Sequence, residues 1–215
     1  MLVSYKMIVV DIETSGVDYL HSGIWQIGAV DLSTKEEFFQ ESRIDEEDSV
    51  SSEALLVIGK TEKQLRDSIK QSQKKLLANF FQWYSKRKNK VFIAQNPQFD
   101  LVFLDIKAKK YGLKSLFGYR AFDIHTIGAL RHMQINGNFL IEKELSGMRL
   151  SEIIQFCGLK DTRVIVEKGK IIQKGASHNA LEDAYLEAEC FSRLVFGKNF
   201  LSKYSGFPIP KELKK

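Results

Sequence analysis

The hydrophobic pattern of the chain predicts five β-strands. Each is a run of apolar and β-favouring residues bounded by turn signals or charged residues. They cover residues 5–10, 24–32, 37–44, 91–94 and 121–124. A short polar connection joins the second run to the third, which predicts an antiparallel hairpin. The first run leads directly into Asp11-Ile12-Glu13 and a Ser15-Gly16 turn, so we expect a buried strand with carboxylates at its end.

Apolar residues at helical spacing predict helices in the rest of the chain. The predicted ranges are 61–65, 69–86, 97–111, 124–133, 151–157 and 179–195. Thr61 and Asn96 are typical N-cap residues, and Pro97 suits a first helical turn. Gly158 and Gly197 follow two of the predicted C-termini. Residues 164–172 predict a small hairpin inserted before the last helix, so strands dominate the first half and helices the second.

Length and composition favour one globular domain with free thiols. The chain has 215 residues, of which 44% are hydrophobic, with 14 Gly and 3 Pro. No apolar run approaches the ~20 residues of a membrane span, and residues 1–10 lack a leader pattern, so we predict a cytoplasmic protein without a membrane partner. Cys157 and Cys190 lie in apolar helical patterns, which predicts buried free cysteines. We expect the main domain to cover residues 1–197, followed by a packed basic C-terminal extension over 198–215.

Charge is distributed unevenly along the sequence. The net charge is +5, but residues 31–53 hold nine acidic and two basic side chains, a net of −7. Residues 83–120 hold nine basic and two acidic side chains, a net of +7. Two solvated faces would explain this pattern, and so would a basic surface for a polyanion. On the second interpretation, Lys107, Lys109 and Lys110 guide a phosphate backbone.

Four acidic residues could converge on one site. Asp11 and Glu13 are two apart in a strand, so their side chains share one face. Asp100 lies in the first turns of the helix after the fourth strand and can project toward the same end of the sheet. Asp183 lies roughly 130° from the apolar stripe of the last helix, which fits either solvent or the floor of a cleft. Ion pairs or helix-dipole contacts would explain each residue singly.

Phosphodiester hydrolysis is one reaction that needs such a set of residues. Two hard cations held by converging carboxylates can activate water and stabilise the leaving oxygen. His178 lies five residues before Asp183 and is a candidate general base for the attacking water, since imidazole titrates near pH 7. The other three histidines, His21, His125 and His132, have no such context.

Three segments together resemble a known family. They are Asp11-Ile12-Glu13-Thr14-Ser15-Gly16, Asn96-Pro97-Gln98-Phe99-Asp100 and His178-Asn179-Ala180-Leu181-Glu182-Asp183-Ala184. In this order they are similar to the three motifs of the DnaQ-like 3′-to-5′ exonucleases, in the branch with four acids and a histidine (DEDDh). The resemblance extends over most of the chain. It implies an α/β, ribonuclease H-like fold, with a mixed five-stranded sheet and flanking helices.

The resemblance also implies a site and a reaction. Asp11, Glu13, Asp100 and Asp183 would hold two Mg²⁺ or Mn²⁺ ions, and His178 would deprotonate the attacking water. The enzyme would release nucleoside 5′-monophosphates from a free 3′ end of single-stranded DNA or RNA. Substrate contacts would come from four further residues, namely Thr14, Gly16, Asn96 and Phe99. The hairpin at 164–172 lengthens the loop before His178, which leaves the position of this histidine open.

Several alternatives stay open at this level. DNA proofreading would require a polymerase in trans, because no polymerase domain is attached. RNA trimming of the oligoribonuclease type is a second enzymatic alternative. A non-catalytic nucleic-acid-binding module of the same fold is a third, although such modules usually lack one of the metal-binding acids. A dinucleotide-binding dehydrogenase is disfavoured, because no Gly-x-Gly-x-x-Gly follows the first strand.

Overall fold

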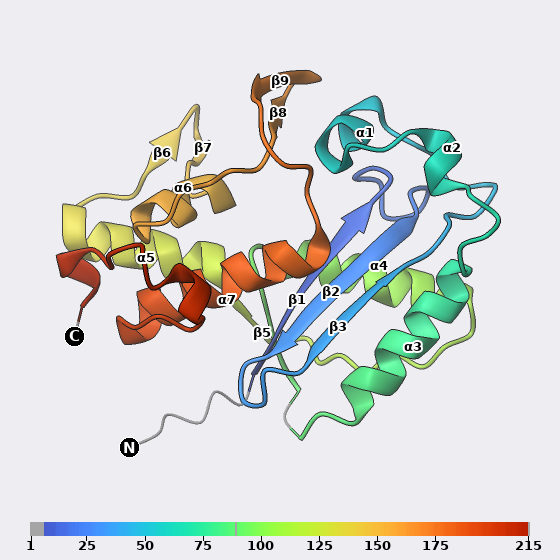
Figure 1. The fold of residues 1–215 in the computed structure, drawn as a ribbon, viewed down its shortest axis with the longest axis horizontal. Coiled ribbons are helices and arrows are strands. Elements are labelled where there is room, and N and C mark those ends of the chain that lie inside the picture. Colours follow the sequence, from blue (N-terminus) through green and yellow to red (C-terminus); the bar gives the residue numbers. More distant parts are fainter. Residues whose placement is uncertain (1–6, 89, 215) are drawn as a thin grey trace.

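Five strands form one mixed sheet at the centre of the computed structural model, which describes residues 7–88 and 90–214 (Figure 1). The strands are β1 (Met7–Thr14), β2 (Ile24–Asp31), β3 (Glu37–Glu41), β4 (Val91–Ala94) and β5 (Ala121–Asp123). Their order is β3-β2-β1-β4-β5. β1 and β3 pair antiparallel with β2, whereas the β1–β4 and β4–β5 pairs are parallel. The predicted antiparallel hairpin is confirmed, and the predicted start of the first strand at residue 5 lies outside the described residues.

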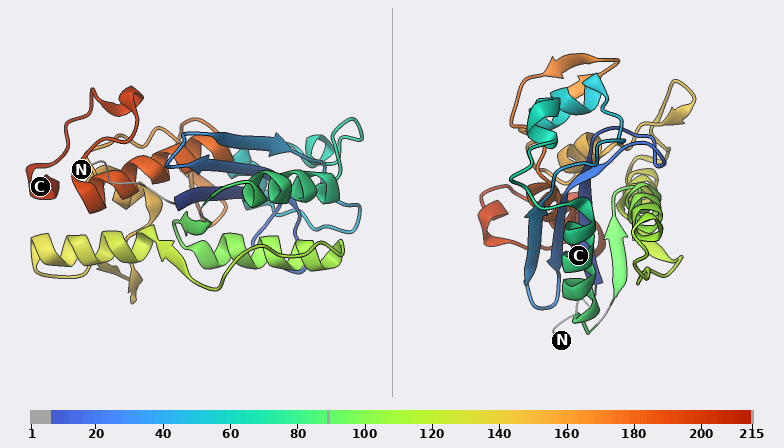
Figure 2. Two further views of the ribbon diagram at one scale, coloured as in Figure 1. Left: turned by 90° about the horizontal axis from the view of Figure 1, so that it is seen from below. Right: turned by 90° about the vertical axis from the view of Figure 1, so that its right-hand side faces the viewer.

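Helices cover both faces of the sheet (Figure 2). On one face, α3 (Gln73–Ser85) and α4 (Pro97–Lys110) pack over Ile8 and Val10 of β1. On the other face, Val9 of β1 packs with α5 (Ile124–Asn136), α6 (Leu150–Phe156) and α7 (Ala180–Phe196). Because neighbouring residues of a strand point to opposite faces, Asp11 and Glu13 lie on the same side as Val9, facing α7.

Two short helices and two small hairpins connect the main elements. Helices α1 (Ser52–Ile58) and α2 (Glu62–Leu65) connect β3 to α3. Two small hairpins flank α6, one formed by β6 (Ile141–Glu142) and β7 (Leu145–Ser146), the other by β8 (Ile165–Glu167) and β9 (Lys170–Gln173). The β8–β9 hairpin and the Thr61 cap of α2 agree with the sequence prediction, whereas α1 and the β6–β7 hairpin were not predicted.

Two local predictions are corrected by the structure. The helix predicted over 69–86 begins later, because the Ser72 side chain caps α3 and Ile69 is 92% exposed. Asn96 stands at the N-cap position of α4, as predicted, but its backbone is left-handed with a φ of 62° and its side chain makes no capping bond.

The C-terminal segment packs against α7. It contains two short 3₁₀ turns, η1 (Ser202–Tyr204) and η2 (Lys211–Leu213). The buried Arg193 guanidinium donates to the carbonyls of Tyr204 and Phe207, which ties this segment to the helix. Cys157 and Cys190 are buried and free, as predicted. Among the residues that the structure describes, no helix has the length and apolar character needed to cross a membrane.

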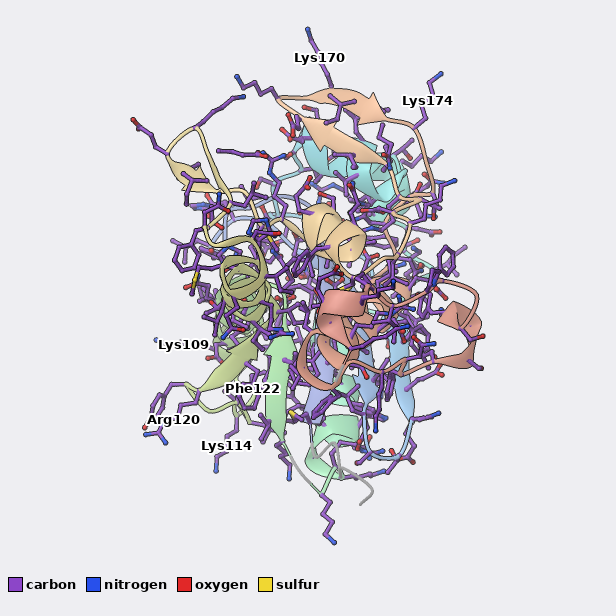
Figure 3. All side chains as sticks on the ribbon, turned by 90° about the vertical axis from the view of Figure 1, so that its left-hand side faces the viewer. Lys109, Lys114, Arg120, Phe122, Lys170 and Lys174 are labelled. Carbon is purple, nitrogen blue, oxygen red and sulfur yellow. The ribbon has the colours of Figure 1, made fainter. Side chains whose placement is uncertain are left out.

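The acidic and basic segments of the sequence pair with one another. Lys107 is 1% exposed and binds Asp48 at 2.7 Å, while Lys110 binds Asp45 at 2.6 Å. The prediction that Lys107 guides a phosphate backbone is therefore wrong, and Lys110, which is partly exposed, already pairs with acidic side chains. Other cations of this segment are exposed at positions away from the β8–β9 hairpin (Figure 3), namely Lys109, Lys114 and Arg120.

Candidate active site

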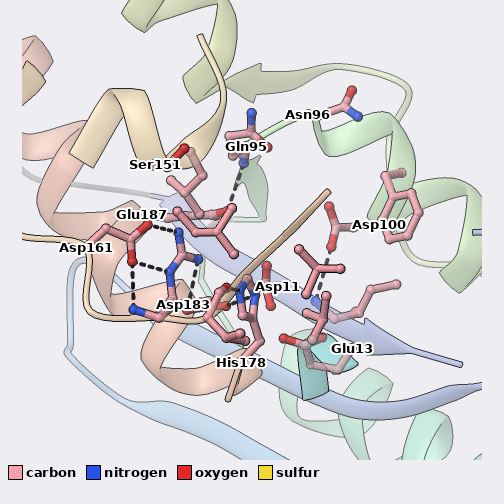
Figure 4. A pocket seen from close by; sticks show the side chains of 18 residues that line it. Asp11, Glu13, Gln95, Asn96, Asp100, Ser151, Asp161, His178, Asp183 and Glu187 are labelled. Carbon is pink, nitrogen blue, oxygen red and sulfur yellow. Dashed lines mark hydrogen bonds and ion pairs between the residues drawn. The ribbon is translucent and has the colours of Figure 1, made fainter. Parts of the chain in front are cut away.

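The four predicted acids and His178 line one cavity of about 330 Å³. Figure 4 shows Asp183 on one side of this cavity, Glu13 and Asp100 on the other, and Asp11 between them. The structure therefore brings together all five residues that the sequence predicted to form a site.

The parallel pairing of β1 and β4 explains how two of the acids meet. Both strands end at the same edge of the sheet, and α4 begins two residues after β4. Asp100, in the first turn of α4, accepts a hydrogen bond from the backbone N–H of Ile12 at 3.2 Å. This bond fixes the Asp100 carboxylate next to Asp11 and Glu13.

A close contact between α7 and β2 positions Asp183. A Cβ atom at Gly28 would lie 2.2 Å from the backbone carbon of Ala180, so only glycine permits this approach. The Gln26 side chain accepts a hydrogen bond from the Ala180 N–H at 3.2 Å, and Asn179 caps the helix. Asp183 is consequently 2% exposed and lies on the floor of the cavity. The helical pattern had left open whether this residue faces solvent or a cleft, and the structure places it in the cleft.

His178 makes contacts through both ring nitrogens. Nδ1 lies 3.1 Å from Asp183 Oδ2, and Nε2 lies 3.0 Å from the carbonyl oxygen of Val164, just before β8. A carbonyl only accepts, so Nε2 carries a hydrogen in this arrangement. Burial opposes the charged imidazolium, but the contact with Asp183 and the nearby charge of Glu13 outweigh it and raise the pKa of His178. These contacts favour the charged imidazolium over the neutral ring.

Electrostatics in the cavity favour bound cations. Burial, followed by repulsion from Asp183, raises the pKa of Asp11 well above its usual range and that of Glu13 to about 8. Burial also raises the pKa of Asp100 strongly. Asp183 Oδ1 is buried and accepts no hydrogen bond from any residue that the structure describes. Ligand atoms of Glu13, His178 and Asp183 lie within 4.8 Å of one another, and the carboxylate oxygens among them suit a hard divalent cation.

Three further charged residues line the cavity and were not predicted from the sequence. Glu187 lies one helical turn after Asp183 on α7, a spacing that could have identified it. Burial and repulsion from Asp100 raise its pKa, and its Oε2 accepts no hydrogen bond within the described residues. Asp161 and Arg163 come from the loop before β8 and carry no sequence signal that would connect them to the other acids.

The predicted substrate contacts divide into two groups. Asn96 and Phe99 line the cavity. The Phe99 ring also packs against Phe103, with centroids 4.9 Å apart. Thr14 and Gly16 are not among the residues that line the cavity, and the Thr14 hydroxyl donates instead to the Gly16 carbonyl at 2.7 Å.

The chain matches one protein family over most of its length. Residues 6–195 match the family described as the 3′-5′ exoribonuclease Rv2179c-like domain. This agrees with the resemblance to DnaQ-like exonucleases that the three motifs indicate. Comparison with curated protein sequences gives no match.

Solved structures of E. coli exonuclease I share the fold. Its complex with a 5cy-dT13 oligonucleotide is 14% identical, with a TM-score of 0.64, over 86% of this chain and 39% of that chain. A complex with a dA16 oligonucleotide is 15% identical, with a TM-score of 0.64, over 88% of this chain and 40% of that chain. The zinc-bound complex with single-stranded DNA is 14% identical, with a TM-score of 0.62, over 88% of this chain and 40% of that chain. The chain thus spans about two-fifths of these proteins, and the predicted ribonuclease H-like fold is confirmed.

Proposed function

The chain belongs to the family of Rv2179c-like 3′-5′ exoribonuclease domains, and on this basis we propose that it is a metal-dependent exonuclease that shortens single-stranded RNA from the 3′ end. Each turnover releases one nucleoside 5′-monophosphate. The observation that carries the proposal is the meeting of four acids, three of them buried, and a histidine in one cavity. Gathering several carboxylates in one cavity is unfavourable for stability unless a cation meets them, which fits a catalytic role.

Divalent cations fit the carboxylates of this cavity. Asp11, Glu13 and Asp183 would hold one Mg²⁺ or Mn²⁺, and Asp11 with Asp100 a second. When bound, the two ions supply Lewis-acid chemistry to the attacking water and to the leaving oxygen. Their charge would also offset the repulsion that raises the pKa of Asp11 and Glu13.

His178 is the proposed general base. It needs a free ring nitrogen to accept a proton from water, yet both nitrogens have partners in the structure. His178 must therefore lose the hydrogen on Nε2, or be released from Asp183 at Nδ1 without a hydrogen there, before it accepts a proton from water. Because Val164 immediately precedes β8, a displacement of the β8–β9 hairpin would break the contact between Nε2–H and the Val164 carbonyl and allow this hydrogen to leave.

The lining of the cavity is compatible with a single-stranded substrate. Val164 and Ile165, at the start of the hairpin, line it on one side, and Val57 of α1 lines it as well. The backbone N–H of His178 donates to the Val57 carbonyl at 3.0 Å, so these segments are linked. Phe99 offers an aromatic face on which an unpaired terminal base can stack.

A degradation assay tests this function. The protein is incubated with Mn²⁺ or Mg²⁺ and 5′-labelled RNA and DNA oligomers of equal sequence. We expect stepwise shortening of RNA from the 3′ end, no activity in EDTA and no activity for Asp11→Asn. Asp105→Asn, an exposed aspartate on α4, is the matched control and keeps full activity. Activity that survives in Asp11→Asn would refute the assignment.

The same assay separates the alternatives. Preferential degradation of DNA favours proofreading, for which a polymerase in trans stays a prediction. Fast cleavage restricted to di- and trinucleotides favours an oligoribonuclease-type role. Tight RNA binding without shortening at any metal concentration indicates the non-catalytic binding module.

A further inference from the structure

Arg163 projects a buried guanidinium into the acidic cavity. Its side chain is 9% exposed and that of Asp161, its main partner, is 3% exposed. Arg163 Nε donates to Asp161 Oδ1 at 3.0 Å, and Nη2 donates to Oδ2 at 2.8 Å. These two bonds occupy Nε and Nη2 on one edge of the guanidinium, so Nη1 makes no bond to Asp161.

The backbone around Arg163 is held firmly. Its own N–H donates to Asp161 Oδ1 at 3.0 Å, so one carboxylate orients both the main chain and the side chain. Two backbone hydrogen bonds join the segments that lead into and out of the β8–β9 hairpin. The Val164 N–H donates to the Ala176 carbonyl at 2.7 Å, and the Ala176 N–H donates to the Thr162 carbonyl at 2.9 Å. A Cβ at Gly175 would lie 2.3 Å from the Thr162 carbonyl oxygen, which shows how closely these segments pack.

The free edge of Arg163 faces the catalytic carboxylates. Nη1 lies 3.2 Å from Asp183 Oδ1. This is an ion pair without hydrogen-bond alignment, because Asp183 Oδ1 accepts no hydrogen bond from the described residues. Burial disfavours the charged guanidinium, but Asp161 and Asp183 outweigh this effect and raise the pKa of Arg163, so it stays a cation.

An exonuclease with this cavity must bring another anion into it. The scissile phosphodiester is negatively charged and has to lie beside Asp183, in a cavity that six acidic side chains line. Guanidinium groups pair with phosphate through directed hydrogen bonds and keep their charge at any working pH. Arg163 Nη1 is a cationic donor at this position, and Asp161 holds it there.

We propose that Arg163 binds a non-bridging oxygen of the scissile phosphate through Nη1, with Asp161 as the residue that positions it. This inference rests on the proposed function. It adds a phosphate-binding cation to the four acids and the histidine, and it gives the loop before β8 a role in substrate binding. If Arg163 served only to neutralise the acids, it would affect stability but would not recognise the phosphate charge.

Binding of matched oligonucleotides tests the proposal. Two single-stranded RNA 12-mers are compared, both with a 2′-O-methyl group on the penultimate nucleotide. One has a normal last phosphodiester and the other a neutral methylphosphonate there. Affinities are measured in Ca²⁺, with gels to confirm that the oligomers stay intact. The dissociation constant of the methylphosphonate oligomer divided by that of the phosphodiester oligomer reports recognition of the phosphate charge.

We expect Arg163→Gln to lower this ratio by roughly 10- to 100-fold, the value of one charge-assisted hydrogen bond. Asp161→Asn lowers it partly, because Arg163 keeps its charge but loses its orientation. Arg163→Lys also gives an intermediate ratio, and it carries the test if Arg163→Gln does not fold. The control is Arg87→Gln, which removes a distant ion pair with Glu36 and keeps the wild-type ratio.

Two results would overturn the inference. If the wild-type protein discriminates between the oligomers and degrades RNA, but folded Arg163→Gln and Arg163→Lys discriminate equally well, Arg163 is a structural cation and the proposed function stands. If the wild-type protein neither binds the oligomers nor degrades RNA, the proposed function and the inference fail together.

Discussion

Replacing Glu13 by Gln should make the metal-free protein more stable at alkaline pH. Glu13 is buried, and burial together with Asp183 raises its pKa from 4.5 to about 8. A raised pKa means that the folded state binds this proton more tightly than the unfolded state. The stability associated with protonated Glu13 is fully present below pH 4.5 and is lost as the pH rises through about 8.

The size of this effect follows from the two pKa values. Each pKa unit corresponds to about 1.4 kcal/mol, so the difference between 4.5 and about 8 sets an upper limit of roughly 5 kcal/mol. Water entry into the cavity reduces this limit. Gln has nearly the same shape and no charge, so the variant avoids the loss. At pH 4 the two proteins should have similar stability, because Glu13 is then neutral in the folded and the unfolded states.

Urea denaturation in EDTA, followed by the fluorescence of buried Trp25 and partly buried Trp83, measures the effect. We expect the free energy of unfolding of the wild type to fall between pH 5 and 8.5, and that of Glu13→Gln to fall by several kcal/mol less. Mn²⁺ at 100 times its dissociation constant should add about 2.7 kcal/mol to the wild type at pH 8, and little to the variant. The control is Glu53→Gln, an exposed glutamate in α1. An equal loss of stability with pH in Glu13→Gln and in the wild type would refute the reasoning.

Three further predictions concern turnover and binding. His178→Ala should lower the single-turnover rate by roughly 10²- to 10⁴-fold while RNA affinity changes little, and an unchanged rate would assign the proton transfer to another group. Phe99→Ala should weaken RNA binding by about 1–3 kcal/mol and Phe99→Trp should retain it, as measured by fluorescence anisotropy; equal affinities in both variants would exclude stacking. Replacing the exposed cations of the β8–β9 region with Gln should lower RNA affinity and its salt dependence. The same change in a control set away from this hairpin should have little effect, and the reverse result would place the RNA path elsewhere. The first set is Lys168, Lys170 and Lys174, and the control set is Lys109, Lys114 and Arg120.

The elements that build the sheet could be predicted from local sequence. Strand patterns, the β2–β3 connection and the Asn96-Pro97 helix start are all encoded by neighbouring residues, so their positions agree with the structure to within a few residues. One predicted helix boundary differs, because a capping side chain and not an apolar residue sets the start of the helix. Ile69 is apolar but exposed, because Ser72 supplies the hydrogen bond that starts α3.

The meeting of the acids was also predictable, but their partners were not. Asp11, Glu13, Asp100 and Asp183 follow strand ends and helix starts, which converge at one edge of the sheet. Asp161 and Arg163 reach the same cavity through an irregular loop whose path depends on the bonds between Thr162, Val164 and Ala176. Such long-range backbone pairing leaves no periodic signal in the sequence.

Charge provides the clearest case in which local reasoning failed. A run of lysines on α4 has the composition of a nucleic-acid-binding surface. Lys107 instead lies in the interior, with Asp48 at 2.7 Å. Composition does not tell which cations are already paired within the fold.

The buried Lys107–Asp48 pair also constrains how this protein can evolve. The two residues are 59 positions apart, and Gln73 also contacts the same aspartate. Losing either charge alone would leave the other buried and unpaired, which typically costs 3–5 kcal/mol, whereas an apolar pair of similar volume can be neutral. We therefore expect positions 48 and 107 to change together among descendants of a common ancestor. A comparison of related sequences would detect this as covariation between two sites far apart in the chain.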